Sequence, residues 1–242
     1  MSEPTVIPPR TGEVIGDAPD RRVEILSDAA PLAATWSRFG PGRDGADLHV
    51  HHHHTDLFYV LEGEFTARLG PEGDEHALPP GTLTRIPPDV VHGFRNASSV
   101  EMRYLNLHAP GRGFAEYMRG LRDGAPVDFF DQHDPPADGG RPVSLAVVGH
   151  RETVVDRPGL QVDLLADADE VAVAEVRLDG KAPGATHDHL VSYYVLDGEL
   201  ALGDTTLAAG TWAQVPAGLP HALAGVGRYL EIHTPGGGAF SS

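Results

Sequence analysis

The sequence HVHHHHTD at residues 49–56 opens a pattern that the chain contains twice. The first copy continues at set intervals with Gly63, Gly81, Pro87, His92 and Asn96. The second copy begins with HDH at residues 187–189 and continues at similar intervals with Gly198, Gly210, Pro216, Gly218 and His221. An internal repeat of this length predicts two tandem copies of one structural unit.

The segments that flank the pattern repeat as well. YVLEGE at residues 59–64 corresponds to YVLDGE at 194–199, and YLNLHAPG at 104–111 corresponds to YLEIHTPG at 229–236. At 242 residues the chain is long enough for two domains of ordinary size. Its 29 glycines and 21 prolines favour short strands and tight turns over long helices.

Apolar residues run together or alternate in five short segments, which predicts strands at 57–61, 65–69, 83–86, 92–95 and 100–108. Strands this short, at this spacing, are typical of an all-β sandwich or barrel. One segment departs from this rhythm. In residues 113–122 apolar side chains recur at helical spacing, which predicts a short amphipathic helix with Phe114, Tyr117, Met118 and Leu121 on one face.

These elements suggest where the two units begin and end. We expect an N-terminal unit at residues 1–123, in which the helix comes last and a leading arm over 1–30 adds one or two strands. Residues 124–142 are rich in Pro, Gly and Asp and are expected to form a linker. The C-terminal unit is then expected at residues 143–242.

Composition limits the possible partners. A formal charge of −17 argues against nucleic acids and anionic membrane surfaces, which bind basic patches. Without cysteine the chain has neither disulfides nor thiolate metal ligands. No run of 18 apolar residues occurs. We therefore expect a soluble, cytoplasmic protein, monomeric or homodimeric, that acts on a small molecule without nucleic-acid or membrane partners.

The residue types in the first copy are typical of a metal site. His49 and His51 alternate along a predicted strand, so their side chains share one face. Asp56 follows after a short loop, and His92 belongs to another predicted strand. Three imidazoles and a carboxylate suit a divalent transition metal with open coordination positions for substrate, water or dioxygen.

A simpler interpretation is that the histidine run is a solvated loop. Under either interpretation His52, His53 and His54 are expected in the loop, although His53 or His54 could replace Asp56 as a ligand if Asp56 does not reach the site. What favours a metal site is the complete spacing of the pattern, rather than the HxH segment alone.

These residues resemble the two motifs of the cupin superfamily, in both halves of the chain. The resemblance implies a bicupin: two tandem antiparallel β-barrels of jelly-roll type, with His49, His51, Asp56 and His92 in the four metal positions. The chain departs from the family pattern at three places in the first copy, one of which is the missing glycine six positions before His49. Asp56 stands where the family has glutamate, so its carboxylate must approach by a backbone adjustment or through water. Asp89 stands where the family has a glycine that favours positive φ.

The second copy lacks the acidic ligand but keeps His187, His189 and His221. Three histidines alone can hold a metal, so an occupied site and a vestigial one both stay open. The expected cofactor is a divalent ion of Fe, Ni, Mn, Cu, Co or Zn, with one or two per chain. His108 and His233 hold matching places near strand ends and are interpreted as structural.

The strand period also predicts a pocket. If Asp56 points inward, then Phe58 and Val60 do so too, and Phe94 follows His92 in the same way. Phe58, Val60 and Phe94 are therefore candidate substrate-binding residues, and Asp56 is the candidate catalytic base.

Similarity to quercetin-dioxygenase-type bicupins implies a metal-dependent, dioxygenase-like oxidoreductase that acts on a small organic substrate such as an aromatic or flavonol-like molecule. Two alternatives stay open. One is a metal-assisted isomerase or decarboxylase that does not use dioxygen, and the other is a non-catalytic bicupin that binds a small molecule. Fold alone does not choose among them.

Overall fold

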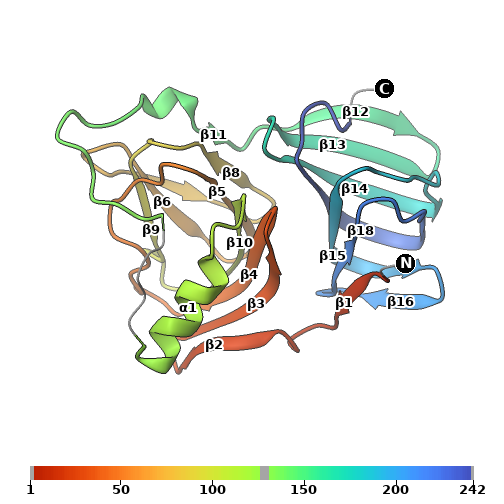
Figure 1. Cartoon of the computed structure of the whole chain (residues 1–242), viewed down its shortest axis with the longest axis horizontal. Coiled ribbons are helices and arrows are strands. Elements are labelled where there is room, and N and C mark those ends of the chain that lie inside the picture. The colour runs from red at the N-terminus through yellow and green to blue at the C-terminus, as the bar shows by residue number, and fades with distance from the viewer. Residues whose placement is uncertain (1–2, 126–130, 241–242) are drawn as a thin grey trace. The chain divides into compact units, whose positions relative to one another are not determined.

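The computed structural model describes residues 3–125 and 131–240, and the chain divides into two compact units (Figure 1). The N-terminal unit comprises residues 13–149. The C-terminal unit comprises residues 150–242 together with residues 1–12. Both units are built almost wholly from antiparallel strands, which confirms the all-β expectation.

The N-terminal unit consists of two sheets. The larger has seven strands in the order β11-β8-β5-β10-β4-β3-β2. Its strands are β2 (Glu13–Ala18), β3 (Arg21–Ala29), β4 (Leu32–Phe39), β5 (Thr55–Glu62), β8 (Leu83–Ile86), β10 (Met102–Ala109) and β11 (Val147–Val148). The smaller sheet has the order β7-β6-β9, formed by β6 (Phe65–Leu69), β7 (Asp74–Leu78) and β9 (His92–Arg95).

The core of this unit lies between the two sheets, as in a β-sandwich. Phe58 of β5 packs on Phe65 of β6 with ring centroids 4.8 Å apart, and Phe65 packs edge-on against Tyr104 of β10 at 5.2 Å. All three rings are almost completely buried. The predicted strands 65–69, 83–86 and 92–95 match β6, β8 and β9, while β5 and β10 differ from their predicted ends by one or two residues.

The predicted helix is α1 (Phe114–Asp123), and it lies beside β2 and β3 (Figure 1). Its apolar face is buried through Phe114 and Met118. Its polar face is held by Arg119, which forms an ion pair at 2.8 Å with Glu13. The helix ends where Gly124 adopts a left-handed conformation (φ +63°), which a glycine reaches without steric strain.

The C-terminal unit contains one large sheet in the order β1-β17-β15-β18-β14-β13-β12, with β16 paired to β15. Its strands are β1 (Thr5–Ile7), β12 (Glu152–Arg157), β13 (Leu160–Asp167), β14 (Ala172–Lys181), β15 (Leu190–Leu202), β16 (Thr205–Ala208), β17 (Trp212–Val215) and β18 (Leu223–Thr234). The long strands β15 and β18 pair from Leu190 to Leu202 and position the histidines of the second copy.

The unit boundaries differ from the sequence expectation at both ends. In the leading arm, β1 pairs with β17 of the C-terminal unit, where Val6 lies opposite Ala213. The expected linker and the residues that follow it, up to residue 149, belong to the N-terminal unit. They include the short 3-10 helix η1 (Val143–Leu145) and strand β11, which pairs with β8. Edge strands offer unpaired backbone groups to any nearby segment, and composition alone does not reveal such pairing.

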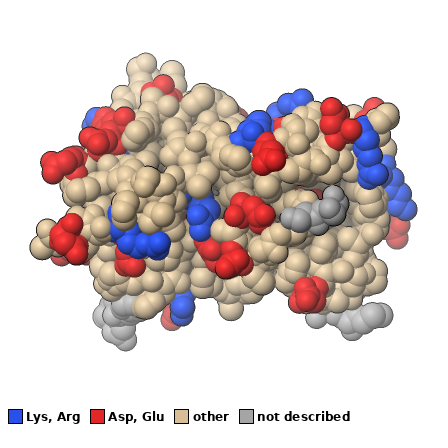
Figure 2. All heavy atoms as spheres, turned by 90° about the horizontal axis from the view of Figure 1, so that it is seen from above, with Lys and Arg blue, Asp and Glu red and all other residues tan. Residues whose placement is uncertain are grey.

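Charged side chains lie on the surface in small groups. On the face drawn in Figure 2, Lys and Arg stand near Asp and Glu rather than in one basic area. Arg95 of β9, for example, forms an ion pair with Glu75 of β7 at 2.8 Å. Within the described parts of the chain, no helix is both long and apolar enough to cross a membrane.

Candidate metal centre

An isolated antiparallel bridge brings the HxH segment to His92. The backbone N–H of His49 donates to the carbonyl of His92 at 2.8 Å, and His92 donates back to His49 at 2.9 Å. The segment belongs to none of the strands defined above, so the expected strand is reduced to two isolated bridges, one from His49 to His92 and one from Val50 to His133. Asp89 donates its N–H to the His51 carbonyl at 2.7 Å and has a φ of +65°, the conformation expected for that turn.

Asp56 enters the same cluster from β5. Asn106 of the neighbouring strand β10 donates its side-chain amide to Asp56 Oδ1. Asp56 Oδ2 then lies 3.6 Å from His51 Nε2 and 3.4 Å from His92 Nε2. The aspartate therefore reaches the histidines directly, although it is one methylene shorter than glutamate.

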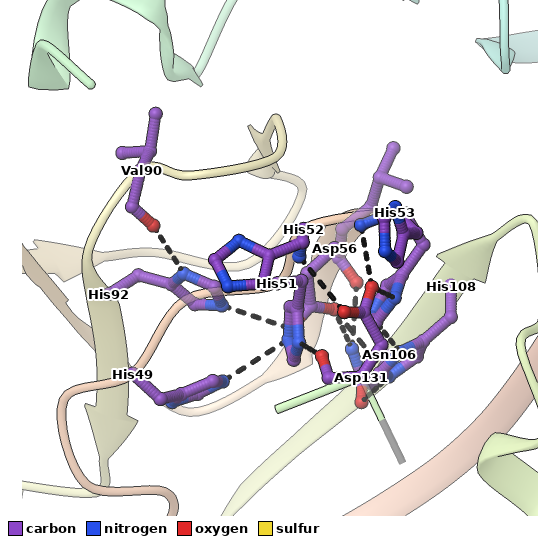
Figure 3. A network of polar contacts seen from close by, with 12 residues as sticks. His49, His51, His52, His53, Asp56, Val90, His92, Asn106, His108 and Asp131 are labelled. Carbon is purple, nitrogen blue, oxygen red and sulfur yellow. Dashed lines mark hydrogen bonds and ion pairs between the residues drawn. The ribbon is translucent and has the colours of Figure 1, made fainter. Parts of the chain in front are cut away.

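Figure 3 shows the rings of His49, His51 and His92 turned toward one another. Each of these imidazoles places its Nδ1 against a backbone carbonyl oxygen. The pairs are His49 with Asp47 at 2.7 Å, His92 with Val90 at 2.9 Å, and His51 with Asp131. Because a carbonyl oxygen can only accept, each Nδ1 must carry a hydrogen, and in the neutral form of each ring Nε2 then presents a lone pair.

These lone pairs converge on one point. His49 Nε2 and His51 Nε2 are 3.2 Å apart with no hydrogen to share, and the buried His92 Nε2 has no hydrogen-bond partner among the described residues. Ligand atoms of His49, His51, His92 and Asp56 all lie within 4.8 Å of one another. Buried acceptors that face one another are unfavourable unless a cation lies among them, so this arrangement fits a metal ion.

The protonation states suit the same role. Burial lowers the pKa of His49 to about 3, so its imidazole is neutral at pH 7. Burial by itself would raise the pKa of Asp56, but the neighbouring His108, His51 and His92 outweigh it and hold that pKa well below its ordinary value. Neutral imidazoles and an ionised carboxylate are the forms that bind metals.

Asp131 supports the cluster from outside the ligand set. Besides its carbonyl, which accepts from His51, its carboxylate accepts from the backbone N–H groups of His52 at 3.0 Å and His53 at 2.6 Å. The residue is completely buried. Burial by itself would raise the pKa of Asp131, but these hydrogen bonds outweigh burial and lower that pKa to about 2. Asp131 lies in the expected linker, where no sequence motif marks it.

A chain of polar contacts continues from Asp131 back to Asp56. Asp131 Oδ2 lies 2.9 Å from His54 Nδ1, and His54 Nε2 lies 3.0 Å from His108 Nδ1. His108 Nε2 lies 2.9 Å from the side-chain oxygen of Asn106, whose amide holds Asp56. Ligand atoms of His51, His54 and His108 also lie within 4.8 Å of one another. His54, expected in a loop, and His108, interpreted as structural, thus belong to the site's network.

A cavity of about 280 Å³ opens onto the cluster, and His49, His51 and Asp56 line its inner end. Of the three predicted substrate contacts, only Phe94 lines this cavity within the described chain. Phe58 packs behind Phe94 with ring centroids 5.1 Å apart, and Val60 lies fully buried in the core. Asp56 and Phe58 lie on the same face of β5, as the strand period predicts. Past Asp56, however, Phe94 separates this face from the cavity.

The second copy brings a different set of histidines together. His187 and His189 share a cluster with His233 of β18, with ligand atoms within 4.8 Å of one another. The predicted third ligand, His221, has other partners: its Nδ1 donates to the Leu219 carbonyl at 3.0 Å, and its Nε2 accepts from the Tyr193 hydroxyl at 2.8 Å. The Nε2 of His221 is therefore engaged by the Tyr193 hydroxyl rather than facing His187 and His189.

Comparison with known proteins identifies the fold. Residues 35–108 match the family model of the cupin domain. A solved structure of a single-residue variant of oxalate decarboxylase from Bacillus subtilis superposes with a TM-score of 0.69 at 14% identity and covers 96% of this chain and 77% of that chain. Residues 35–108 are therefore a cupin domain, and the chain as a whole has the fold of a bicupin.

Two further relatives extend the comparison. Protein Ylba from E. coli superposes on the bicupin with a TM-score of 0.68 at 17% identity, covering 96% of this chain and 90% of that one. In sequence, the bicupin is 34% identical over 108 residues to quercetin 2,3-dioxygenase of Bacillus subtilis (strain 168). That match covers 45% of this chain and spans only 31% of the relative's length.

Proposed function

We propose that the N-terminal barrel holds one divalent transition metal ion through His49, His51, His92 and Asp56, and that the protein is a dioxygenase-like oxidoreductase acting on a small organic molecule. The observation that carries this proposal is the convergence of three imidazole lone pairs and one carboxylate in a buried cluster. The 34% identity to a quercetin 2,3-dioxygenase supports the reaction class.

The metal would supply Lewis acidity and redox chemistry toward dioxygen, which the amino-acid side chains lack. The chain's own residues bind, orient and shield the substrate. Phe94 and the buried face of α1, through Phe114 and Met118, line the cavity with apolar surface that excludes water. An apolar or aromatic body is the substrate type that such a wall favours.

Asp56 is the proposed proton acceptor. It lines the cavity, is ionised, and has one oxygen fixed by the amide of Asn106. When its Oδ2 is not holding the ion, this carboxylate can take the proton of an acidic substrate hydroxyl that enters the inner end of the cavity. Asn106 and His108 would hold the carboxylate at the orientation this transfer requires.

The test combines elemental analysis with an oxygen electrode. We expect protein purified without an affinity tag to contain about one transition-metal ion per chain and to consume oxygen with a flavonol or another aromatic substrate. His51→Ala should abolish both. His76→Ala, which removes an exposed histidine from β7, is the matched control and should change neither.

Two outcomes would count against this function. Unchanged metal content in His51→Ala would contradict the metal site. Turnover that is equally fast without oxygen would contradict the dioxygenase class and favour a metal-assisted isomerase or decarboxylase instead.

A further inference from the structure

The cavity of the N-terminal barrel has a cationic end as well as a metal-binding end. Its floor is formed by alternate residues of β3, β4 and β10, which share one face of the sheet. His108 and Asn106 lie at the inner end, near Asp56. Arg21 and Tyr104 lie farther along the same cavity, beside Phe39.

Arg21 differs from the arginines around it because it lacks an acidic partner. Among residues 3–125 and 131–240 no carboxylate forms an ion pair or hydrogen bond with its guanidinium, and its buried Nε has no partner there. By contrast, Arg22 pairs with Glu24 at 2.6 Å, and Arg43, which lines the same cavity, pairs with Asp20. The chain has 35 acidic and only 18 basic residues, so carboxylates are available to pair with most arginines. A guanidinium at a cavity wall that lacks such a pair is suited to bind an anionic ligand.

The surroundings of Arg21 restrict that anion to one attached to an apolar body. The guanidinium carbon lies 6.0 Å from the centroid of the Phe39 ring, in the range of a cation–π contact. Phe39 in turn packs on Phe94 with centroids 5.9 Å apart. A ligand that reaches Arg21 from the inner end therefore passes along aromatic side chains.

The length of the cavity floor limits the size of this ligand. On β10 the inner residue His108 and the outer residue Tyr104 are four positions apart, which corresponds to about 13 Å of strand. A molecule of two fused aromatic rings with one acidic group fits between the two ends. The planar guanidinium of Arg21 matches a carboxylate through two parallel hydrogen bonds.

We propose that the substrate of the N-terminal site is an aromatic carboxylic acid, whose carboxylate binds Arg21 while its ring system lies along Phe39 and Phe94 toward the histidine cluster. This assignment rests on the proposed function for the identity of the reacting end. It concerns binding, however, and can be measured without turnover.

The experiment compares two probes that differ only in charge, 2-naphthoate and 2-naphthamide, by calorimetric titration of the protein as purified. The wild-type protein should bind the carboxylate at least about tenfold more tightly than the amide, as expected for a charge-assisted pair. Arg21→Met should remove this preference and leave amide binding within about twofold. Arg21→Lys, which retains the charge but not the planar fork, should keep part of the preference.

Arg38→Met is the matched control, because Arg38 lies on β4 but does not line the cavity. This variant should keep the full preference for the carboxylate. Thermal unfolding of all variants shows that they are folded, and since Arg21 forms no ion pair with the described residues, Arg21→Met should unfold close to the wild-type temperature.

Equal affinity of the wild-type protein for both probes, no measurable binding of 2-naphthoate, or an unchanged preference in Arg21→Met would overturn the assignment. These results are independent of oxygen consumption. A preference that depends on Arg21 in a protein that consumes no oxygen would uphold the ligand class and reject the dioxygenase proposal. Oxygen consumption without such a preference would uphold the dioxygenase proposal and reject the ligand class.

Discussion

The two barrels carry the same histidine pattern, yet their histidines have different hydrogen-bond partners. In the N-terminal barrel the Nδ1 atoms of His49, His51 and His92 are hydrogen-bonded to neutral backbone carbonyls, and their Nε2 atoms face the cluster. In the C-terminal barrel His233 donates from Nε2 to the Glu231 carboxylate at 3.0 Å, and its Nδ1 lies 2.8 Å from His189 Nε2. The hydrogen-bond partner of one ring nitrogen thus decides whether the other nitrogen of that imidazole can act as a ligand.

Burial and the acidic ligand separate the two sites further. The four ligand residues of the first site are at most 5% exposed. In the second, His187 and His189 are half-buried, and Asp188, whose carboxylate lies 2.9 Å from His189 Nδ1, is fully exposed. Position 191, where the repeat calls for an acid, is Val191. We therefore expect one metal ion per chain, held in the N-terminal barrel.

The largest predicted effect is on thermal stability. A chelator should lower the unfolding temperature only when the histidines of the N-terminal barrel are intact. A ligand that binds only the folded state stabilises it by about 4 kcal/mol when its concentration is a thousand times its dissociation constant. Chelation should therefore lower the unfolding temperature of the wild-type protein and of His189→Ala by several degrees. It should leave His51→Ala unchanged, because that variant has no metal to lose.

Differential scanning calorimetry with and without EDTA measures both effects. A chelator shift that disappears in His189→Ala but persists in His51→Ala would reverse the comparison between the barrels.

The second prediction concerns Asp131, which has no counterpart in the second barrel's repeat. Asp131→Ala removes a buried acceptor with four hydrogen-bond partners and should lower the free energy of unfolding by about 2–4 kcal/mol. Metal affinity should also fall by about 10–100-fold, since the carboxylate anchors the segment whose backbone carbonyl orients His51. Asp134→Ala, at an exposed position nearby, is the control and should alter neither quantity. Urea unfolding and competition with a fluorescent chelator measure the two effects, and wild-type metal affinity in Asp131→Ala would refute the supporting role.

The sequence predicted the strands and the four converging side chains because both follow from local pattern. Alternation and turn residues define β6, β8 and β9, and the motif spacing brings His49, His51, Asp56 and His92 together. It missed the residues whose role depends on contacts across long separations. Asp131 lies 80 residues from the His51 ring that it orients. His233 replaces His221 in the second cluster because Tyr193 engages His221, a pairing that no spacing rule contains.

The third prediction is a pH dependence of the metal-free protein. Burial lowers the pKa of His49 to about 3 and of His54 to about 4, while an unfolded imidazole titrates near 6.5. Between about pH 6.5 and pH 4 these two imidazoles therefore bind protons in the unfolded chain but stay neutral in the folded state. The free energy of unfolding is fully retained above pH 6.5 and falls as the pH decreases, by up to about 1.4 kcal/mol per pH unit for each histidine.

Urea unfolding of chelated protein at pH 7, 6 and 5 measures this slope. His54→Gln should reduce it, whereas His76→Gln, at an exposed position, should leave it unchanged. The same slope in both variants would show that His54 is protonated as readily in the folded barrel as in the unfolded chain.

The smallest expected effect is that of Tyr193→Phe in the C-terminal barrel. Loss of the hydroxyl that donates to His221 should cost about 1 kcal/mol of unfolding free energy. It should not create a metal site, since His189 remains paired with His233, and His233 with Glu231. Elemental analysis of the variant after incubation with excess Zn²⁺ checks this, and a second bound equivalent would show that Tyr193 alone keeps the second barrel free of metal.

The most direct test of the difference between the barrels is a crystal structure of the protein as purified, with anomalous data collected at the absorption edge of the metal found by elemental analysis. We predict one strong anomalous peak among His49, His51, Asp56 and His92, and none beside His187, His189 and His233. A peak at the second position, or the absence of a peak at the first, would contradict the conclusion that the ring-nitrogen partners select the ligands.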